Sequence, residues 1–350
     1  MQQFVTEILR MGNSEPVDMA SAEVQRAIAN DRDLKLHLAS GENMLLRDSL
    51  GRITPPESGA VVVMDVRTGE VISMVSSPTY DPNIFTERLL TRDWRRLQEH
   101  PRNPLLNRVT AGAYAPGSTF KMVVALAALE AGIISEKTRH FCNGSMDLGN
   151  RTFHCWFEDG HGSMNVIKAL ERSCDVFFYE VALKTGIQRI KNMALRLGLG
   201  FPTGIDIPGE KPGIIPSHDW KLATHGVVWT PGETVNAGIG QGYVLTTPLQ
   251  LAVMIARLAN AELAVTPSLQ VLDSPPAFEP LDISPAALRT IRKGMFQVTH
   301  GGLGTARAHN LSSSLGGMAG KTGTVQVKRI TNEQREDGIT KNIERPWKER

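Results

Sequence analysis

The chain has 350 residues, of which 41% are hydrophobic and 21% charged, and its formal net charge is +2. This composition is typical of a globular protein with a large core, and the near-neutral charge gives no support for a nucleic-acid-binding protein. No apolar run reaches the roughly 18 to 20 residues that span a bilayer, and the first residues do not form a signal peptide, so we expect a soluble chain without a membrane anchor.

The first clear element in chain order is a β-hairpin. Residues 1–57 are mostly polar with weak periodicity, and we expect them to form a lead-in that ends at a Pro-rich linker before Ser58. The runs 60–66 and 70–76 are rich in Val, Ile and Met and are joined by Arg67-Thr68-Gly69. This pattern predicts an antiparallel hairpin in a well-covered sheet. The main domain is therefore expected over residues 58–350.

Helical segments follow the hairpin. We expect helices over residues 93–99, 119–131, 165–184, 188–197, 248–259 and 284–298, the third interrupted near Ser173. The glycine run 238–242 follows no β-run, which favours a tight turn over a nucleotide-binding loop. Residues Lys321–Val327 are expected to form a strand. The chain is thus predicted to have a mixed α/β (α+β) fold, with helices covering an antiparallel sheet.

One turn leads directly into a helix at Ala115-Pro116-Gly117-Ser118-Thr119-Phe120-Lys121. Ser118 is therefore expected at a helix N-terminus, where free backbone N–H groups favour developing negative charge. Lys121 lies one turn further along the same face, and a neutral lysine amine there can take the serine proton. A Ser-x-x-Lys pair also arises by chance in a chain of this length, so the motif needs support from elsewhere.

The tripeptide Lys-Thr-Gly occurs twice. The copy that starts at Lys184 ends a predicted helix, where Gly186 would be the C-cap, and we interpret it as structural. The copy that starts at Lys321 follows a run of small residues, so a ligand could approach its backbone closely. A cation and a hydroxyl side by side there suit a substrate that carries a carboxylate.

Three motifs together resemble those of the penicillin-recognising serine transpeptidases and β-lactamases: Ser118-Thr119-Phe120-Lys121, Ser173-Cys174-Asp175 and Lys321-Thr322-Gly323. Their order and spacing, with the strings 59–65 and 238–242, are similar to the class B, elongation-type penicillin-binding proteins of the penicillin-binding protein 2 group. The resemblance extends from about residue 58 to the C-terminus. It implies the transpeptidase fold shared by penicillin-binding proteins and β-lactamases, and it identifies residues 1–57 as a remnant of an N-terminal pedestal region.

The resemblance also implies a peptidoglycan D,D-transpeptidase mechanism. Ser118 would attack the D-alanyl-D-alanine carbonyl of a stem peptide to form an acyl-enzyme, with Lys121 as the general base. Ser173 would relay the proton to the leaving amine, and Asp175 completes the second motif. An amine from a neighbouring stem peptide then takes the acyl group, whereas a β-lactam acylates the same serine and remains attached.

The third motif would bind the substrate. The resemblance implies that Lys321, Thr322 and Gly323, with Thr324, hold the terminal carboxylate of the stem peptide. The backbone N–H groups of Ser118 and Thr324 would form the oxyanion hole. A nearby Lys321 would also lower the pKa of Lys121 by like-charge repulsion.

The sequence departs from the family pattern in two places. Asp175 stands where Asn is common in the superfamily, a difference that is usual in the elongation branch. In relatives, two strands and a helix follow the loop that here ends at Arg350, and those strands separate the hairpin from the Lys321 strand. We therefore expect a chain truncated at both ends, in which the Lys321 strand lacks a neighbour, so that the family activity cannot simply be carried over to it.

The three cysteines suggest a metal site near the second motif. Their odd number excludes a complete disulfide framework, and the glycine-flanked His161 is poor core material. Three thiolates and one imidazole are a tetrahedral zinc set, and elongation-type enzymes are similar in having a metal site there. We expect a structural zinc, with no cofactor required for the chemistry, on Cys142, Cys155, His161 and Cys174. The alternatives are unrelated thiols, a Cys142–Cys155 disulfide, or ligation by His154 or Asp159.

The resemblance implies a setting and leaves other functions open. The expected partners are stem peptides, β-lactams, a SEDS-type glycosyltransferase and other proteins of the cell-wall elongation complex, at the periplasmic face of the bacterial inner membrane. A β-lactamase or D,D-carboxypeptidase would use the same serine with water as the acceptor. A third reading is a catalytically silent β-lactam-binding sensor or scaffold.

Overall fold

A computed structural model describes residues 46–47, 53–54, 58–86, 89–270, 276–311 and 317–325. Its strands are β1 (Leu46–Arg47), β2 (Ile53–Thr54), β3 (Gly59–Met64), β4 (Val71–Ser77), β5 (His140–Cys142), β6 (Ser145–Leu148), β7 (Arg151–His154) and β8 (Gly162–Met164). Its helices are α3 (Thr91–Gln98), α4 (Lys121–Glu130), α5 (Val166–Glu171), α6 (Asp175–Thr185), α7 (Ile187–Arg196), α8 (His218–His225), α9 (Pro231–Gly238), α10 (Pro248–Asn260) and α11 (Pro285–His300). Within these ranges, no helix combines the length and the apolar character needed to cross a bilayer.

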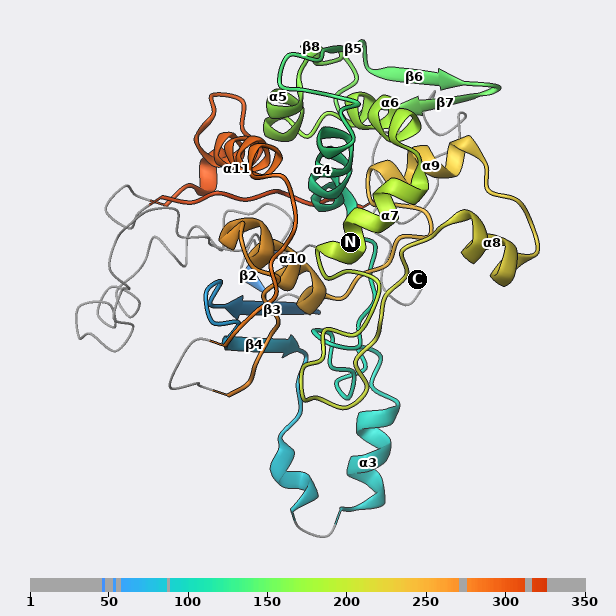
Figure 1. Ribbon diagram of the computed structural model, residues 1–350. Helices are drawn as coiled ribbons and strands as arrows, with labels where there is room; N and C mark the ends of the chain where they lie inside the picture. The colour runs from blue at the N-terminus through green and yellow to red at the C-terminus, as the bar shows by residue number, and fades with distance from the viewer. Residues whose placement is uncertain are drawn as a thin grey trace.

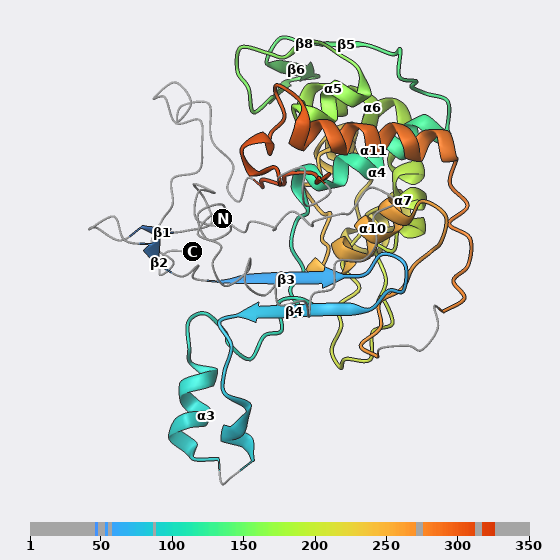
Figure 2. The same cartoon turned by 90° about the vertical axis from the view of Figure 1, so that its left-hand side faces the viewer.

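The predicted hairpin is confirmed, but the expectation that it lies in a well-covered sheet is wrong for the described residues, because Val63, Ile72 and Val75 are exposed on the two-stranded sheet. Strands β3 and β4 pair antiparallel, with Val62 opposite Met74. Gly69 closes the turn at φ +75°, a conformation that glycine adopts without strain. Val62 is buried with Leu249 and Ala252 of α10, so the hairpin is held by this helix on one face. Figures 1 and 2 show α10 between the hairpin and the helices α4 and α11.

The centre of the molecule is α4, which follows the Ser118 turn. All residues from Lys121 to Ala128 are buried. A helix that is apolar on every side must be surrounded by other elements, and α4 contacts α6, α7 and α11. The helix is consequently a rigid base for the residues that precede it.

Two helices, α8 and α9, were not predicted. Helix α8 has only Lys221 buried, so it carries no apolar stripe that periodicity could detect. Helix α9 begins with a capping box formed by Thr230 and Glu233, with Pro231 at the start. This signal could have been read from the sequence.

The prediction of a strand over Lys321–Val327 is wrong for the residues that the structure describes. Residues 321–325 have no strand structure, and residues 326–327 lie outside the described residues. A strand requires a neighbour for its backbone N–H and C=O groups, and no described strand lies beside this segment. The residue just before this segment packs against α11 instead, because the Gly320 N–H donates to Met295 O over 3.2 Å. The expected lead-in over residues 1–57 lies mostly outside the described residues, and the domain division stays a prediction.

Candidate active site

Ser118 lies in a 3₁₀ turn, Gly117–Phe120, that runs into α4. Gly117 has φ +56°, and its N–H donates to Gly240 O over 2.9 Å. The Ser118 side chain is half-buried, and among the described residues no hydrogen bond engages its hydroxyl. The serine therefore stands at a helix N-terminus, as predicted. The expected hydrogen bond between its hydroxyl and Lys121 is not formed, because the Lys121 amine bonds Ser173 and Asp175 instead.

Gly240, in the glycine run that precedes α10, packs directly against the turn that carries Ser118. A Cβ at this position would lie 2.2 Å from Gly117 O and 2.7 Å from Phe120 Cβ, and the residue has φ +69°. We predict that Gly240→Ala lowers the free energy of unfolding by about 1–3 kcal/mol and slows acylation of Ser118, because the turn must move. Chemical denaturation and acylation kinetics measure the two effects. Gly302→Ala, where nothing lies within 4 Å, is the control and should change little.

Lys121 joins the first motif to the second. Its Nζ donates to Ser173 O over 2.8 Å, to Ser173 Oγ over 3.2 Å and to Asp175 Oδ1 over 2.7 Å. The side chain is fully buried, so these acceptors take the place of water. Three acceptors match the three N–H donors of an ammonium group. Sequence reasoning brought these residues together, but it missed the direct contact between Lys121 and the Asp175 carboxylate.

Ser173 terminates α5 in the left-handed region. Its φ is 53°, its N–H donates to Leu170 O, and the N–H of Cys174 donates to Ala169 O. This pair of bonds is a Schellman motif, in which glycine is the usual residue at the left-handed position. A serine there bears strain, and it places a hydroxyl beside Lys121.

Two variants of Ser173 separate its hydroxyl from its backbone. Ser173→Ala and Ser173→Gly both remove Oγ, so we predict that both slow acylation to a similar extent. Only the glycine relieves the positive φ, so it should be more stable than the alanine variant by about 1 kcal/mol. Denaturant titrations compare the two. Equal stability of the variants would contradict the strain, and unchanged acylation would contradict the role of the hydroxyl.

The third motif packs against the nucleophile turn. A Cβ at Gly323 would lie 3.1 Å from Thr119 Cγ2 and 3.2 Å from Pro116 O, and a Cβ at Gly117 would lie 2.6 Å from Thr324 O. The Thr324 backbone therefore lies beside the turn that carries the nucleophile. Two small residues at this contact let the backbones approach closely.

Lys321 is buried close to Lys121 and Asp175. Its Nζ donates to Thr322 O over 3.1 Å, and the Thr322 hydroxyl bonds that of Thr305 over 2.8 Å. Burial first, and then the charge of Lys121, hold the pKa of Lys321 well below its ordinary value, although Asp175 opposes the shift. Thr305 was missed by sequence reasoning, because nothing local marks a loop threonine as a neighbour of the third motif.

The other Lys-Thr-Gly copy is structural, as predicted. Gly186 caps α6 with φ +79°, and its N–H donates to Ala182 O. The half-exposed Lys184 lies 3.7 Å from Glu180 on the same helix. This copy makes no contact with the three motifs among the described residues.

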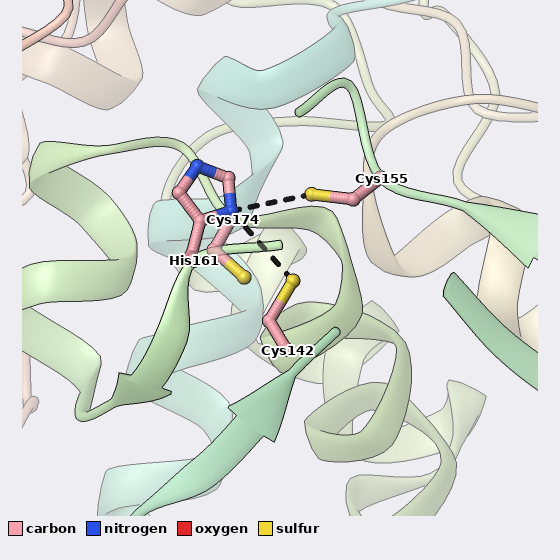
Figure 3. A group of neighbouring side chains, drawn as sticks. All are labelled: Cys142, Cys155, His161 and Cys174. Carbon is pink, nitrogen blue, oxygen red and sulfur yellow. Dashed lines mark hydrogen bonds between the residues drawn. The ribbon is translucent and has the colours of Figure 1, made fainter. Parts of the chain in front are cut away.

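Four buried side chains near the second motif point toward one another (Figure 3). They come from β5, the loop after β7, the loop before β8 and the residue before α6: Cys142, Cys155, His161 and Cys174. Their ligand atoms all lie within 4.8 Å of one another, and all three thiols are free. The alternative of a Cys142–Cys155 disulfide is therefore wrong, and His154 and Asp159 lie outside the cluster.

The cluster has the dimensions of a tetrahedral metal site. At the tetrahedral angle, zinc bonds of about 2.3 Å to sulfur and about 2.0 Å to nitrogen put the two ligand atoms about 3.5 Å apart. The Nδ1 atom of His161 lies 3.4 Å from Cys155 Sγ and 3.7 Å from Cys142 Sγ. The neighbouring Cys174 thiol lowers the pKa of Cys142 to about 6, and the Cys142 and Cys155 sulfurs, with burial, raise the pKa of Cys174. The donor set thus fits a structural zinc without an open position.

Comparison with known proteins agrees with this geometry. The family described as "Penicillin binding protein transpeptidase domain" matches residues 59–342. The chain is 38% identical over 280 residues to the peptidoglycan D,D-transpeptidase MrdA of Escherichia coli K12. This alignment covers 77% of this chain and 44% of that protein. The chain is 36% identical over 291 residues to MrdA of Acinetobacter baumannii, with 79% and 42% covered. The chain spans about half the length of the curated relatives it matches.

Solved structures give the same result. Penicillin-binding protein 2 of Pseudomonas aeruginosa, solved in complex with WCK 5153, superposes with a TM-score of 0.66 at 36% identity, covering 74% of this chain and 63% of that one. Penicillin-binding protein 2 of Helicobacter pylori superposes with a TM-score of 0.69 at 36% identity, covering 72% and 48%. The expected fold, helices with antiparallel strands in the penicillin-binding-protein arrangement, is confirmed. This chain belongs to the penicillin-binding protein transpeptidase family.

Proposed function

We propose that this chain carries the catalytic centre of a peptidoglycan D,D-transpeptidase that cross-links stem peptides through an acyl-enzyme on Ser118. One observation carries the proposal. The buried Lys121 contacts Ser173 and Asp175 of the second motif, while the third motif packs against the turn that holds Ser118. Three segments distant in sequence thus contact the turn and helix that carry Ser118 and Lys121, which supports a shared site.

Each group has a chemical role in this proposal. Lys121, once it has lost its proton, takes the proton of Ser118 as the hydroxyl attacks the D-alanyl carbonyl. Ser173 passes that proton to the leaving D-alanine. The N–H groups of Ser118 and Thr324 stabilise the oxyanion, and Lys321 in its charged form attracts the terminal carboxylate.

The charge of Lys321 makes binding pH-dependent. Its lowered pKa means that the ammonium becomes neutral as the pH rises through a value well below the ordinary 10.5. We predict that the affinity for a penicillin, which carries a carboxylate, declines over that range. In Lys321→Arg the guanidinium stays charged over this whole range, so the decline should move to higher pH. Acylation kinetics across pH measure the profile of each protein. Identical profiles for the wild type and Lys321→Arg would contradict the role of the Lys321 charge in binding.

Incubation with a fluorescent penicillin tests the proposed function. Covalent labelling of the wild-type chain, lost in Ser118→Ala, supports it, and equal labelling of both contradicts it. The lifetime of the acyl-enzyme then distinguishes a transpeptidase from a β-lactamase or D,D-carboxypeptidase, because rapid turnover by water indicates a hydrolase.

We also propose that the cysteine cluster holds a structural zinc. The support is a set of three sulfurs and one imidazole nitrogen, all buried and within 4.8 Å of one another. Zinc would neutralise thiolates that are otherwise costly to bury together. Metal analysis of protein purified without chelator should find about one zinc per chain in the wild type and in the control His225→Ala, and far less in Cys174→Ser. Equal zinc in all three would contradict the site.

The partners are proposed by analogy. Penicillin-binding protein 2 of Helicobacter pylori has been solved in a complex with MreC, and another similar chain belongs to a peptidoglycan synthase complex. We infer that this chain acts with a SEDS-type glycosyltransferase and other elongation proteins at the periplasmic face of the inner membrane. Co-purification from cells of the chain's own source tests this assignment.

A further inference from the structure

Trp156 bonds both ends of the second motif, although no step of the proposed mechanism uses it. Its backbone N–H donates to Asp175 Oδ2 over 2.9 Å. Its indole Nε1–H donates to Ser173 O over 3.0 Å and to Arg172 O over 3.1 Å. One residue thus contacts the carboxylate and the carbonyl that also hold Lys121.

The two acceptors are shared between Trp156 and Lys121. Lys121 Nζ binds Ser173 O over 2.8 Å and Asp175 Oδ1 over 2.7 Å, so Trp156 supplies the second donor to each group. A carbonyl oxygen has two lone pairs, and a carboxylate has two oxygens, so neither donor displaces the other. With both in place, the Ser173 carbonyl and the Asp175 carboxylate are each fixed from two sides.

Trp156 lies next to the cysteine cluster. Trp156 follows Cys155, and its ring lies 5.4 Å from the ring of His161. Arg172, whose carbonyl accepts from the indole, donates in turn to His161 O over 3.2 Å. The indole is nevertheless more than half exposed, at 57%, so burial of apolar surface does not account for its orientation.

We propose that Trp156 is a positioning residue for acylation: its indole N–H fixes the Ser173 carbonyl and thereby the amine of Lys121 and the hydroxyl of Ser173. The need for it follows from the backbone of Ser173, which is held at φ 53°. A non-glycine residue in that region persists only when its surroundings determine it, and the Trp156 bond is one such determinant. The proposal deepens the proposed function and rests on it.

The test is Trp156→Phe, which keeps an aromatic ring and the backbone N–H bond to Asp175 and removes the indole N–H. Loss of the indole N–H, which Ser173 O and Arg172 O share, should lower the first-order acylation constant by about fivefold to tenfold. The dissociation constant of the non-covalent penicillin complex should stay unchanged within about twofold. Stopped-flow kinetics at several penicillin concentrations separate the two constants. Trp156→Tyr also lacks the indole N–H, so its acylation constant should fall by a similar factor. It replaces the Phe variant in the test if the Phe variant does not fold.

Trp94→Phe in α3 is the matched control, because that half-exposed tryptophan lies on a protruding segment far from the second motif (Figures 1 and 2). It should acylate at the wild-type rate. An acylation constant in the Trp156 variants within twofold of the wild type would overturn the proposal, as would a decrease fully explained by a smaller folded fraction. Absence of labelling in the wild-type chain itself would instead refute the proposed function.

Discussion

Replacing Lys121 by methionine is expected to slow acylation of Ser118 by about 10²–10⁴-fold, the usual contribution of a positioned general base. Methionine keeps much of the apolar length of the side chain and removes the amine. The same change leaves the Asp175 carboxylate buried without its cation, so the free energy of unfolding should fall by about 3–5 kcal/mol. Penicillin acylation kinetics and denaturant titration measure the two losses.

The double variant Lys121→Met with Asp175→Asn separates chemistry from stability. The amide is neutral, and its oxygen can still accept from the N–H of Trp156, so most of the lost stability should return. Acylation should stay as slow as in the single variant. A double variant that recovered acylation together with stability would show that Lys121 acts only as a structural cation.

Removal of the proposed zinc is expected to lower stability about as much as Lys121→Met does. A ligand that binds only the folded chain contributes about 4 kcal/mol when its free concentration exceeds Kd a thousandfold. For a domain of this size, about 4 kcal/mol corresponds to a decrease in Tm of roughly 6–8 °C after treatment with a chelator. Acylation should slow as well, because the cluster lies next to Ser173 and Asp175 in the chain.

Calorimetry with and without chelator measures this loss, and added zinc should reverse it. Cys174→Ser provides the control, since its Tm should already be low and should not respond to the chelator. If the wild type contains no zinc and its Tm does not change, the three thiols and His161 are a buried cluster without a metal.

Local sequence signals predicted the elements that hold the site. The hairpin followed from its β-branched runs, and α4 followed from an unbroken run of helix formers after Gly117. The sequence also predicted the interruption of the helix at Ser173. It did not predict the left-handed backbone of Ser173, because serine has no strong preference for that conformation. The strand at Lys321–Val327 failed for a tertiary reason: its Thr and Val content favours a strand, but a strand forms only beside another one.

The contacts within the site were less predictable. The motif resemblance brought Lys121, Ser173 and Lys321 together, and residue chemistry brought the four cluster residues together. The hydrogen bonds that Trp156 donates to Ser173 and Asp175 depend on how the loop after β7 packs against the start of α6. No spacing in the sequence encodes that return, since it follows from packing of the whole helical layer.

The central claim is that the three motifs activate one hydroxyl. The most direct test is mass spectrometry of the chain after reaction with a penicillin and digestion with trypsin. The peptide Val109–Lys121 contains Ser118 as its only serine. We predict that this peptide gains the mass of the intact penicillin, on Ser118, in a single adduct per chain. An adduct on another residue, or none after prolonged incubation of the folded chain, would contradict it.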